Sequence, residues 1–255
     1  MFEIIREQIQ NKAYWDYDLS FIENPGFGGW RLEEDTCKFI GKYCEIYKPE
    51  VIVEFGTGLS TLVLAQEVLK GNVKTIWSID HQKIFPGHPK AIVEQNKAMS
   101  SHVHFDWFPI KMKVYEGKVF QFYDIPDGFF KRMGHIDLVI IDGPPYYFDS
   151  REAALYAVYE QLSKKSLVLL DDANRKNREQ KYIKQWKHHY GKNIQCEIFV
   201  DEFCKGLACL CLTGSKEKIK PFLYGERLSR LLFGIKMVPL KFLSEWRRKV
   251  LNFKL

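Results

Sequence analysis

The chain has 255 residues, of which 46% are hydrophobic and 27% are charged, a composition typical of a globular protein with a full core. No apolar run approaches the roughly 20 residues of a membrane-spanning helix, and the first residues lack the pattern of a secretory signal. The formal net charge of +6 is unevenly placed, because residues 216–255 hold eleven Lys and Arg against three Glu. The sequence therefore predicts a nearly neutral body followed by a basic C-terminal segment.

The cysteines argue for a reducing environment. None of the six forms a Cys-x-x-Cys pair, and most fall inside apolar segments. We therefore expect reduced, mostly buried thiols in a cytoplasmic protein, with neither a zinc site nor a disulfide framework. The positions are Cys37, Cys44, Cys196, Cys204, Cys209 and Cys211.

Residues 1–34 are rich in aromatic side chains set among polar ones, and they contain a Pro-Gly-Phe-Gly-Gly run near their end. We expect a short helix followed by a loop, forming an N-terminal cap segment that packs on the body. Residues 33–47 then show apolar positions at helical spacing, and Pro49 ends that helix.

The most informative stretch follows. Residues 51–55 form an apolar, β-branched run typical of a buried strand, and Gly56 and Gly58 interrupt it. Helix formers resume at Ser60. Glycine lets the backbone approach a ligand closely, and the free N–H groups of the first helical turn point toward that ligand. The stretch therefore predicts a strand–turn–helix cradle for a ligand, with a tight turn that binds nothing as the alternative.

Strand-type and helix-type patterns alternate through the rest of the body. We expect strands at 73–79, 102–108, 136–141 and 166–170, and helices at 89–99, 150–162 and 179–190. A hairpin is expected within 113–123, and two further strands at 194–200 and 206–213. This alternation predicts an α/β fold with a mostly parallel sheet and helices on both faces.

Acidic residues close four of the expected strands. Glu54, Asp80, Asp142 and the pair Asp171-Asp172 all fall at strand carboxyl ends, where open α/β sheets bind their ligands. A single acidic strand end is easily explained as a cap for the next helix. Four such positions in chain order favour a ligand site.

The run Glu54-x-Gly56-x-Gly58 resembles the first motif of class I S-adenosylmethionine-dependent methyltransferases. The resemblance covers about residues 35–213. It implies a Rossmann-like methyltransferase fold with a seven-stranded, mostly parallel sheet that ends in an antiparallel hairpin. It also implies that Asp80 binds the ribose, and that Asp106 or Trp107 lies beside the adenine. The implied S-adenosylmethionine site consists of Glu54, Gly56, Thr57, Gly58, Ser60 and Asp80.

The segments around Asp142 and Asp171-Asp172 resemble the corresponding strands of the catechol-type O-methyltransferase branch. That resemblance implies a divalent ion, for which Mg²⁺ suits hard oxygen ligands, held by Asp142, Asp171 and Asp172. Such an ion would lower the pKa of a substrate hydroxyl and hold its oxygen near the methyl carbon. A metal-free role for the three aspartates is the alternative. Asp142 is followed by Gly-Pro-Pro instead of the residues that carry a lysine base in that branch, so no such base is assigned.

The same segments also resemble a bacterial subgroup with Asp-Gly-Pro-Pro and Asp-Asp-x-x-Arg-x-x-x-Glu signatures. Here Arg175 and Glu179 stand four residues apart at a helix start, which favours an ion pair between them. The alternative is that Arg175 binds an anionic group of the substrate. The candidate catalytic residues are Asp142, Asp171 and Arg175.

These features predict an S-adenosylmethionine-dependent methyltransferase that methylates an oxygen of a small or glycan-type acceptor. One alternative is a nicotinamide-dependent oxidoreductase or epimerase, disfavoured because Thr61 replaces the third glycine of the dinucleotide motif and no Tyr-x-x-x-Lys pair is present. A non-catalytic cofactor-binding adaptor is the other. The predicted division is an N-terminal cap segment at 1–34, a methyltransferase domain at 35–215 and a tail at 216–255.

The tail consists of two basic amphipathic pieces separated at Pro239. Leu and Trp beside Lys and Arg suit peripheral contact with an anionic membrane, and packing on the body or on a second subunit is the alternative. Nucleic acid is not an expected partner, because the basic residues form no recognised binding motif. The oligomeric state is left open by the sequence.

Overall fold

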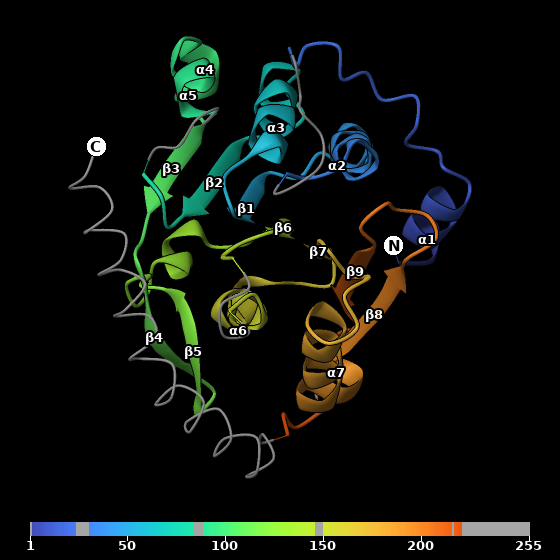
Figure 1. Cartoon of the computed structure of the whole chain (residues 1–255), viewed down its shortest axis with the longest axis vertical. Helices are drawn as coiled ribbons and strands as arrows, with labels where there is room; N and C mark the ends of the chain where they lie inside the picture. Colours follow the sequence, from blue (N-terminus) through green and yellow to red (C-terminus); the bar gives the residue numbers. More distant parts are fainter. Residues whose placement is uncertain (1, 24–30, 84–88, 146–149, 216, 221–255) are drawn as a thin grey trace, which may run out of the picture.

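The computed structural model describes residues 2–23, 31–83, 89–145, 150–215 and 217–220. Its centre is a seven-stranded sheet with the strand order β3-β2-β1-β6-β7-β9-β8 (Figure 1). Strand β9 runs antiparallel to both of its neighbours, and the other pairings of this sheet are parallel. The expected seven-stranded, mostly parallel sheet and its closing hairpin are thus confirmed. The strands are β1 (Val51–Phe55), β2 (Thr75–Asp80), β3 (Val103–Trp107), β6 (Leu138–Ile141), β7 (Leu167–Leu170), β8 (Ile194–Phe199) and β9 (Leu207–Leu212).

Helices cover both faces of the sheet, as Figure 1 shows. One face carries α1 (Phe2–Gln10), α2 (Glu34–Tyr47), α3 (Leu59–Leu69), α4 (Lys90–Glu94) and α5 (Lys97–Ser100). The other face carries α6 (Glu152–Val158), α7 (Glu179–Tyr190) and a separate antiparallel ribbon of β4 (Ile110–Tyr115) and β5 (Lys118–Tyr123). This ribbon is the hairpin expected within 113–123, and it begins earlier in the chain.

Two expected helices are shorter than predicted. The helix expected at 89–99 divides into α4 and α5, because the Asn96 side chain accepts hydrogen bonds from the backbone N–H groups of Ala98 and Met99 and so starts a second helix. The helix expected at 150–162 is α6, followed by the 3₁₀ turn Tyr159–Gln161.

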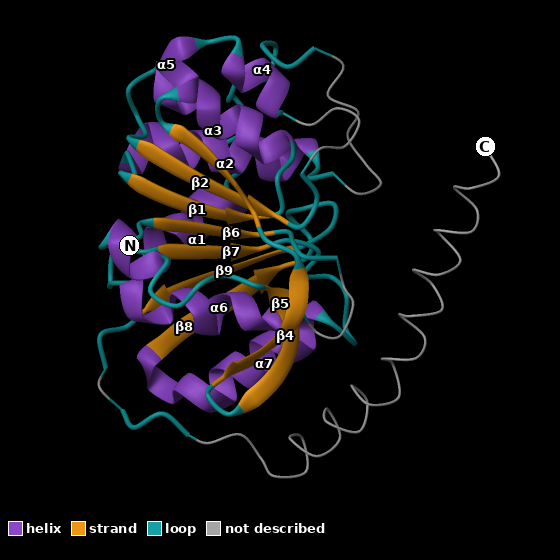
Figure 2. Ribbon diagram, turned by 90° about the vertical axis from the view of Figure 1, so that its left-hand side faces the viewer, coloured by secondary structure: helices purple, strands orange, loops and turns teal. Residues whose placement is uncertain are grey.

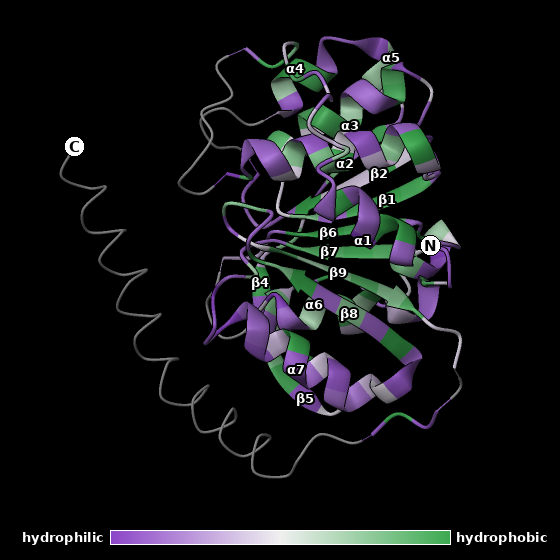
Figure 3. Ribbon diagram, turned by 90° about the vertical axis from the view of Figure 1, so that its right-hand side faces the viewer, coloured by the Kyte–Doolittle hydropathy of each residue, from purple (hydrophilic) through white to green (hydrophobic). Residues whose placement is uncertain are grey.

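The central strands are apolar on both faces, which explains why they read as continuous hydrophobic runs (Figure 3). Alternate residues of β1 enter different cores: Ile52 packs in the cluster beneath α1, α2 and α3, and Val53 in the cluster beneath α6 and α7. Leu138 and Val139 of β6 divide in the same way. The sheet is thus the shared wall of two hydrophobic cores.

Four of the six cysteines are buried, Cys196 is half-buried and Cys204 is exposed. Burial raises the pKa of the Cys44 and Cys209 thiols well above the usual value, so these groups stay protonated at neutral pH. The structure agrees with mostly buried thiols, and the cytoplasmic location stays a prediction.

Both ends of the described chain are attached to the body. Helix α1 buries Phe2, Ile5 and Ile9 in the core beneath α2 and α3. After β9, the backbone N–H of Lys220 donates to the carbonyl oxygen of His189 at 2.9 Å. The rest of the tail, with both predicted amphipathic pieces, lies outside the described residues, so the three-part division stays a prediction. No helix of the described part is long and apolar enough to cross a membrane.

The parallel strands place several chain turns at one edge of the sheet. Figure 2 shows β1, β2, β6 and β7 pointing the same way, with the loops that follow them gathered beyond their carboxyl ends. The four acidic strand ends singled out in the sequence therefore meet at one edge.

Candidate active site

The glycine turn after β1 has the geometry that requires glycine at its first position. Gly56 has a φ of +101°, and a Cβ added there would lie 2.8 Å from the backbone nitrogen of Gly143. Gly58 differs, because a Cβ at this position would meet no atom of the described residues within 4 Å. Gly56 is thus needed for the turn itself, and Gly58 keeps the space in front of it open.

Glu54 lies behind this turn. Its carboxylate is fully buried and accepts hydrogen bonds from the hydroxyls of Ser60, Thr61 and Ser78, the last at 2.7 Å. Burial raises the pKa of Glu54 to about 7, although the three hydroxyl donors act in the opposite direction. Glu54 thus holds the turn and the start of α3 in place.

A cavity of about 430 Å³ lies in front of the turn, within the usual range for small-molecule sites. Five of the six residues predicted for the cofactor line it, and Glu54 is the exception. Its lining also includes residues at the end of β5 and after β6: Tyr123, Asp142, Gly143, Pro145 and Arg151. The cavity thus connects the glycine turn with the acidic end of β6.

Asp80 ends β2 and lines the same cavity. Its carboxylate oxygens accept the backbone N–H groups of Thr57 at 3.0 Å and Gln82 at 2.7 Å. The Nδ1 of His81 also lies 3.1 Å from Oδ1. Oδ2 has only the Thr57 N–H among these contacts, so it has capacity for a ligand hydroxyl. Asp106 and Trp107 are not among the described residues that line this cavity, and the Trp107 indole donates to the carbonyl oxygen of His81.

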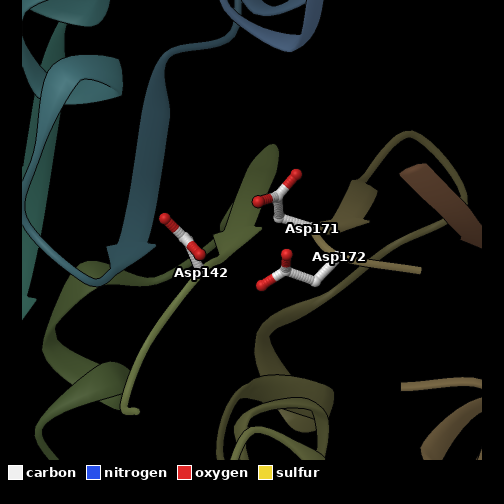
Figure 4. A group of neighbouring side chains, drawn as sticks. All are labelled: Asp142, Asp171 and Asp172. Atoms are coloured by element: carbon white, nitrogen blue, oxygen red, sulfur yellow. The ribbon is translucent and has the colours of Figure 1, made fainter. Parts of the chain in front are cut away.

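The structure brings the three predicted metal ligands together. One carboxylate oxygen from each of Asp142, Asp171 and Asp172 lies within 4.8 Å of the others, beyond the ends of β6 and β7 (Figure 4). Burial raises the pKa of Asp142 to about 6, and burial together with the charges of Asp142 and Asp172 raises that of Asp171 well above its usual value. Among the described residues, Asp171 Oδ1 is buried without a hydrogen-bond partner.

Arg151 is the first of two residues of the site that the sequence analysis did not indicate. Its side chain is 4% exposed and reaches into the carboxylate cluster from the residue just before α6. Nη2 lies 3.0 Å from Asp142 Oδ1, and Nη1 lies 2.8 Å from Asp172 Oδ2 and 3.4 Å from Glu179 Oε1. A buried arginine needs such partners, because an unpaired buried charge is strongly unfavourable.

Arg175 forms the ion pair that its spacing from Glu179 favours. Its Nη1 lies 3.4 Å from Glu179 Oε1 and 2.6 Å from Asp172 Oδ2. It is not among the described residues that line the cavity, so the structure gives no contact between this guanidinium and the space available to a substrate.

Tyr123 is the second residue that the sequence did not indicate. It comes from β5, is fully buried, and lines the cavity with a hydroxyl that has no partner among the described residues. Burial raises its pKa well above the usual value, so the hydroxyl stays a neutral hydrogen-bond donor. An unpartnered buried hydroxyl on a cavity wall is well placed to bind a ligand.

Comparison with known proteins agrees with this geometry. Residues 53–173 match the family model described as a methyltransferase domain. That segment includes the glycine turn, Asp80 and all three aspartates of the cluster. No curated protein matches the sequence significantly.

Two solved structures share the fold. A protein assigned as a caffeoyl-CoA O-methyltransferase from Staphylococcus aureus aligns with a TM-score of 0.50 and 12% identity, covering 82% of this chain and 91% of that one. Cofactor-bound Rv0187 from MTB aligns with a TM-score of 0.50 and 14% identity, covering 80% of this chain and 97% of that one. At these identities the likeness concerns the fold.

The matched domain, the strand order and the cavity at the glycine turn are consistent with one another. Residues 53–173 match a methyltransferase domain on a Rossmann-like methyltransferase fold, which agrees with the class I S-adenosylmethionine-dependent methyltransferase that the first motif predicts.

Proposed function

We propose that the protein transfers the methyl group of S-adenosylmethionine to an oxygen of a small or glycan-type acceptor. The observation that carries this proposal is the single cavity that joins the glycine turn to the carboxylate of Asp142. The cofactor and the acceptor can meet there, which methyl transfer requires. The name of the Staphylococcus aureus structure, an O-methyltransferase on the same fold, supports the choice of oxygen.

In this proposal the glycine turn and Asp80 bind the cofactor. The open space before Gly58 lets the cofactor approach the backbone, and α3 begins at Leu59, where the first N–H groups of a helix have no intrahelical acceptor. Asp80 accepts hydrogen bonds from the ribose hydroxyls with the lone pairs that Thr57 and Gln82 leave. Glu54 acts indirectly, by holding Ser60 and Thr61.

In the reaction, the acceptor oxygen forms a bond to the methyl carbon as the carbon–sulfur bond breaks and S-adenosylhomocysteine leaves. The hydroxyl proton must pass to a base. Asp142 is the one carboxylate of the cluster that lines the cavity among the described residues, so it is the candidate to accept this proton. The positive charge of Arg175 lowers the pKa of Asp142 and so favours its ionised form, and Asp171, the third candidate catalytic residue, belongs to the same cluster.

The residues present fit the predicted Mg²⁺ only in part. Three carboxylates with converging oxygens are suitable ligands, and a bound ion would polarise the acceptor hydroxyl. However, Asp142 and Asp172 each already give an oxygen to the Arg151 guanidinium. Because two of the three carboxylates already have this cationic partner, we derive no step through a divalent ion, and the Mg²⁺ site of the sequence analysis stays an untested prediction.

A thermal-shift comparison tests the proposed function against its alternatives. We expect S-adenosylmethionine to raise the melting temperature of the full chain and NAD to leave it unchanged, because only a ligand that binds the native state stabilises it. Methyl transfer from labelled cofactor to a panel of hydroxylated acceptors then tests catalysis. Stabilisation by NAD alone would favour the oxidoreductase, and cofactor binding without transfer to any acceptor would favour the adaptor.

A further inference from the structure

The strongest feature that the proposed function does not use is the buried guanidinium of Arg151. We propose that Arg151 is the cation that joins Asp142 to Asp172 in the carboxylate cluster and disfavours a divalent ion there. It engages two of the three carboxylates that a divalent ion would need, and it positions Asp142 for a metal-free reaction. The exclusion of metal stands on geometry alone, and the positioning of Asp142 rests on the proposed function.

The donors of Arg151 are almost fully used within the cluster. A guanidinium has about five N–H donors in a fixed planar fork. Nε donates to the carbonyl oxygen of Pro144 at 3.4 Å, Nη1 donates to Asp172 and Glu179, and Nη2 donates to Asp142. Among the described residues, one proton on Nη2 is left, beside the carboxylate that lines the cavity.

This arrangement leaves little opportunity for a divalent ion. Mg²⁺ binds carboxylate oxygens at about 2.0–2.1 Å and demands a nearly octahedral set of ligands. The oxygens of Asp142 and Asp172 that face Arg151 are 3.0 Å and 2.8 Å from its nitrogens. An ion bound between these carboxylates would lie close to a guanidinium that α6 and its own hydrogen bonds hold in place. Repulsion between the two cations would oppose its binding.

The same contacts orient Asp142. One of its oxygens is fixed by Arg151 Nη2, so the carboxylate has a defined direction at the cavity wall. Arg151 lines the cavity as well, and its remaining Nη2 proton can reach an acceptor oxygen beside Asp142. Arg151 is therefore a positioning residue for the proton acceptor, and the forked shape of its side chain matters as much as its charge.

Mn²⁺ binding to the full chain, followed by electron paramagnetic resonance, tests the exclusion of metal without any substrate. We expect no tight binding by the wild type and a new site in Arg151→Met, with affinity raised about tenfold or more. Asp171→Asn added to that variant should abolish the new site. Arg175→Met is the matched control, since it removes a cation that contacts Asp172 and Glu179 but not Asp142, and it should gain no site.

Three results would overturn the proposal. They are tight Mn²⁺ binding by the wild type that Asp171→Asn abolishes, a folded Arg151→Met that gains no site, and an equal gain in Arg175→Met. If Arg151→Met does not fold, Mn²⁺ binding is measured with the wild type and with Arg151→Lys, which keeps a cation at this position. We expect tight binding by neither protein, and tight binding by either one would contradict the exclusion of metal.

Methyl-transfer kinetics test whether Arg151 positions Asp142. We expect EDTA to leave wild-type methyl transfer unchanged, and Arg151→Lys to lower kcat about tenfold or more with unchanged cofactor affinity. Full activity in Arg151→Lys would contradict the positioning role. If the proposed function itself is wrong, the wild type will transfer no methyl group, and the Mn²⁺ result will still decide whether Arg151 excludes metal.

Discussion

Replacing Glu54 by glutamine should make the protein more stable at high pH. The Glu54 carboxylate is fully buried behind the glycine turn, and its pKa is raised from 4.5 to about 7. The folded protein therefore holds the proton more tightly than the unfolded chain does. Stability from this proton is fully present below pH 4.5 and is lost as the pH rises through about 7.

The magnitude follows from that displacement of the pKa. One pKa unit of difference between the folded and the unfolded state corresponds to about 1.4 kcal/mol. Ionising Glu54 in the folded protein therefore costs about 3 kcal/mol more than ionising it in the unfolded chain. Between pH 5 and pH 8 the wild type should lose about 2.5 kcal/mol of unfolding free energy through this one group. A glutamine keeps the volume and can still hydrogen-bond Ser60, Thr61 and Ser78, but it does not ionise.

Urea unfolding of the wild type and Glu54→Gln at pH 5, 6, 7 and 8 measures the effect. We expect the stability of the variant relative to the wild type to increase by about 2.5 kcal/mol across this range. Glu94→Gln, which removes the same charge from an exposed side chain, should change stability by less than about 0.5 kcal/mol at every pH. A stability difference for Glu54→Gln that does not vary with pH would refute the role assigned to burial.

Three further predictions concern the cavity and the tail. Asp80→Ala should weaken S-adenosylmethionine binding by about 1–3 kcal/mol in calorimetry, and unchanged affinity would remove Asp80 from the cofactor site. Gly58→Ala should weaken the binding of S-adenosylmethionine and leave the melting temperature unchanged, because the added Cβ meets only open space. Gly56→Ala should lower the melting temperature, because an alanine is strained at this φ and its Cβ would clash with Gly143. A lower melting temperature in Gly58→Ala and an unchanged one in Gly56→Ala would contradict the roles assigned to the two glycines. Truncation after Lys220 should abolish co-sedimentation with anionic vesicles in low salt, and a full-length chain that stays in the supernatant would disprove membrane contact.

The strands that the sequence located best are those buried on both faces. Residues 51–55, 136–141 and 166–170 are largely apolar runs, and the structure buries the strands within them between two hydrophobic cores. Because such strands run parallel, their acidic ends had to meet at one edge, which made the cluster of Asp142, Asp171 and Asp172 predictable as a group.

The parts that escaped prediction depend on contacts between distant residues. Arg151 is 21 residues from Asp172 and 28 from Glu179, and no local pattern indicates that one guanidinium joins them. Tyr123 enters the cavity from a ribbon outside the main sheet, so its position depends on how that ribbon packs. Asn96 divided a predicted helix through a local cap, which the sequence could have indicated because asparagine is a favoured first residue of helices.

Isothermal titration of S-adenosylmethionine into the full chain tests the central claim most directly. The structure predicts one binding site per chain at the glycine turn, with no heat from NAD under the same conditions. Absence of binding by S-adenosylmethionine, or binding of NAD in its place, would contradict the assignment of the cavity to the methyl donor.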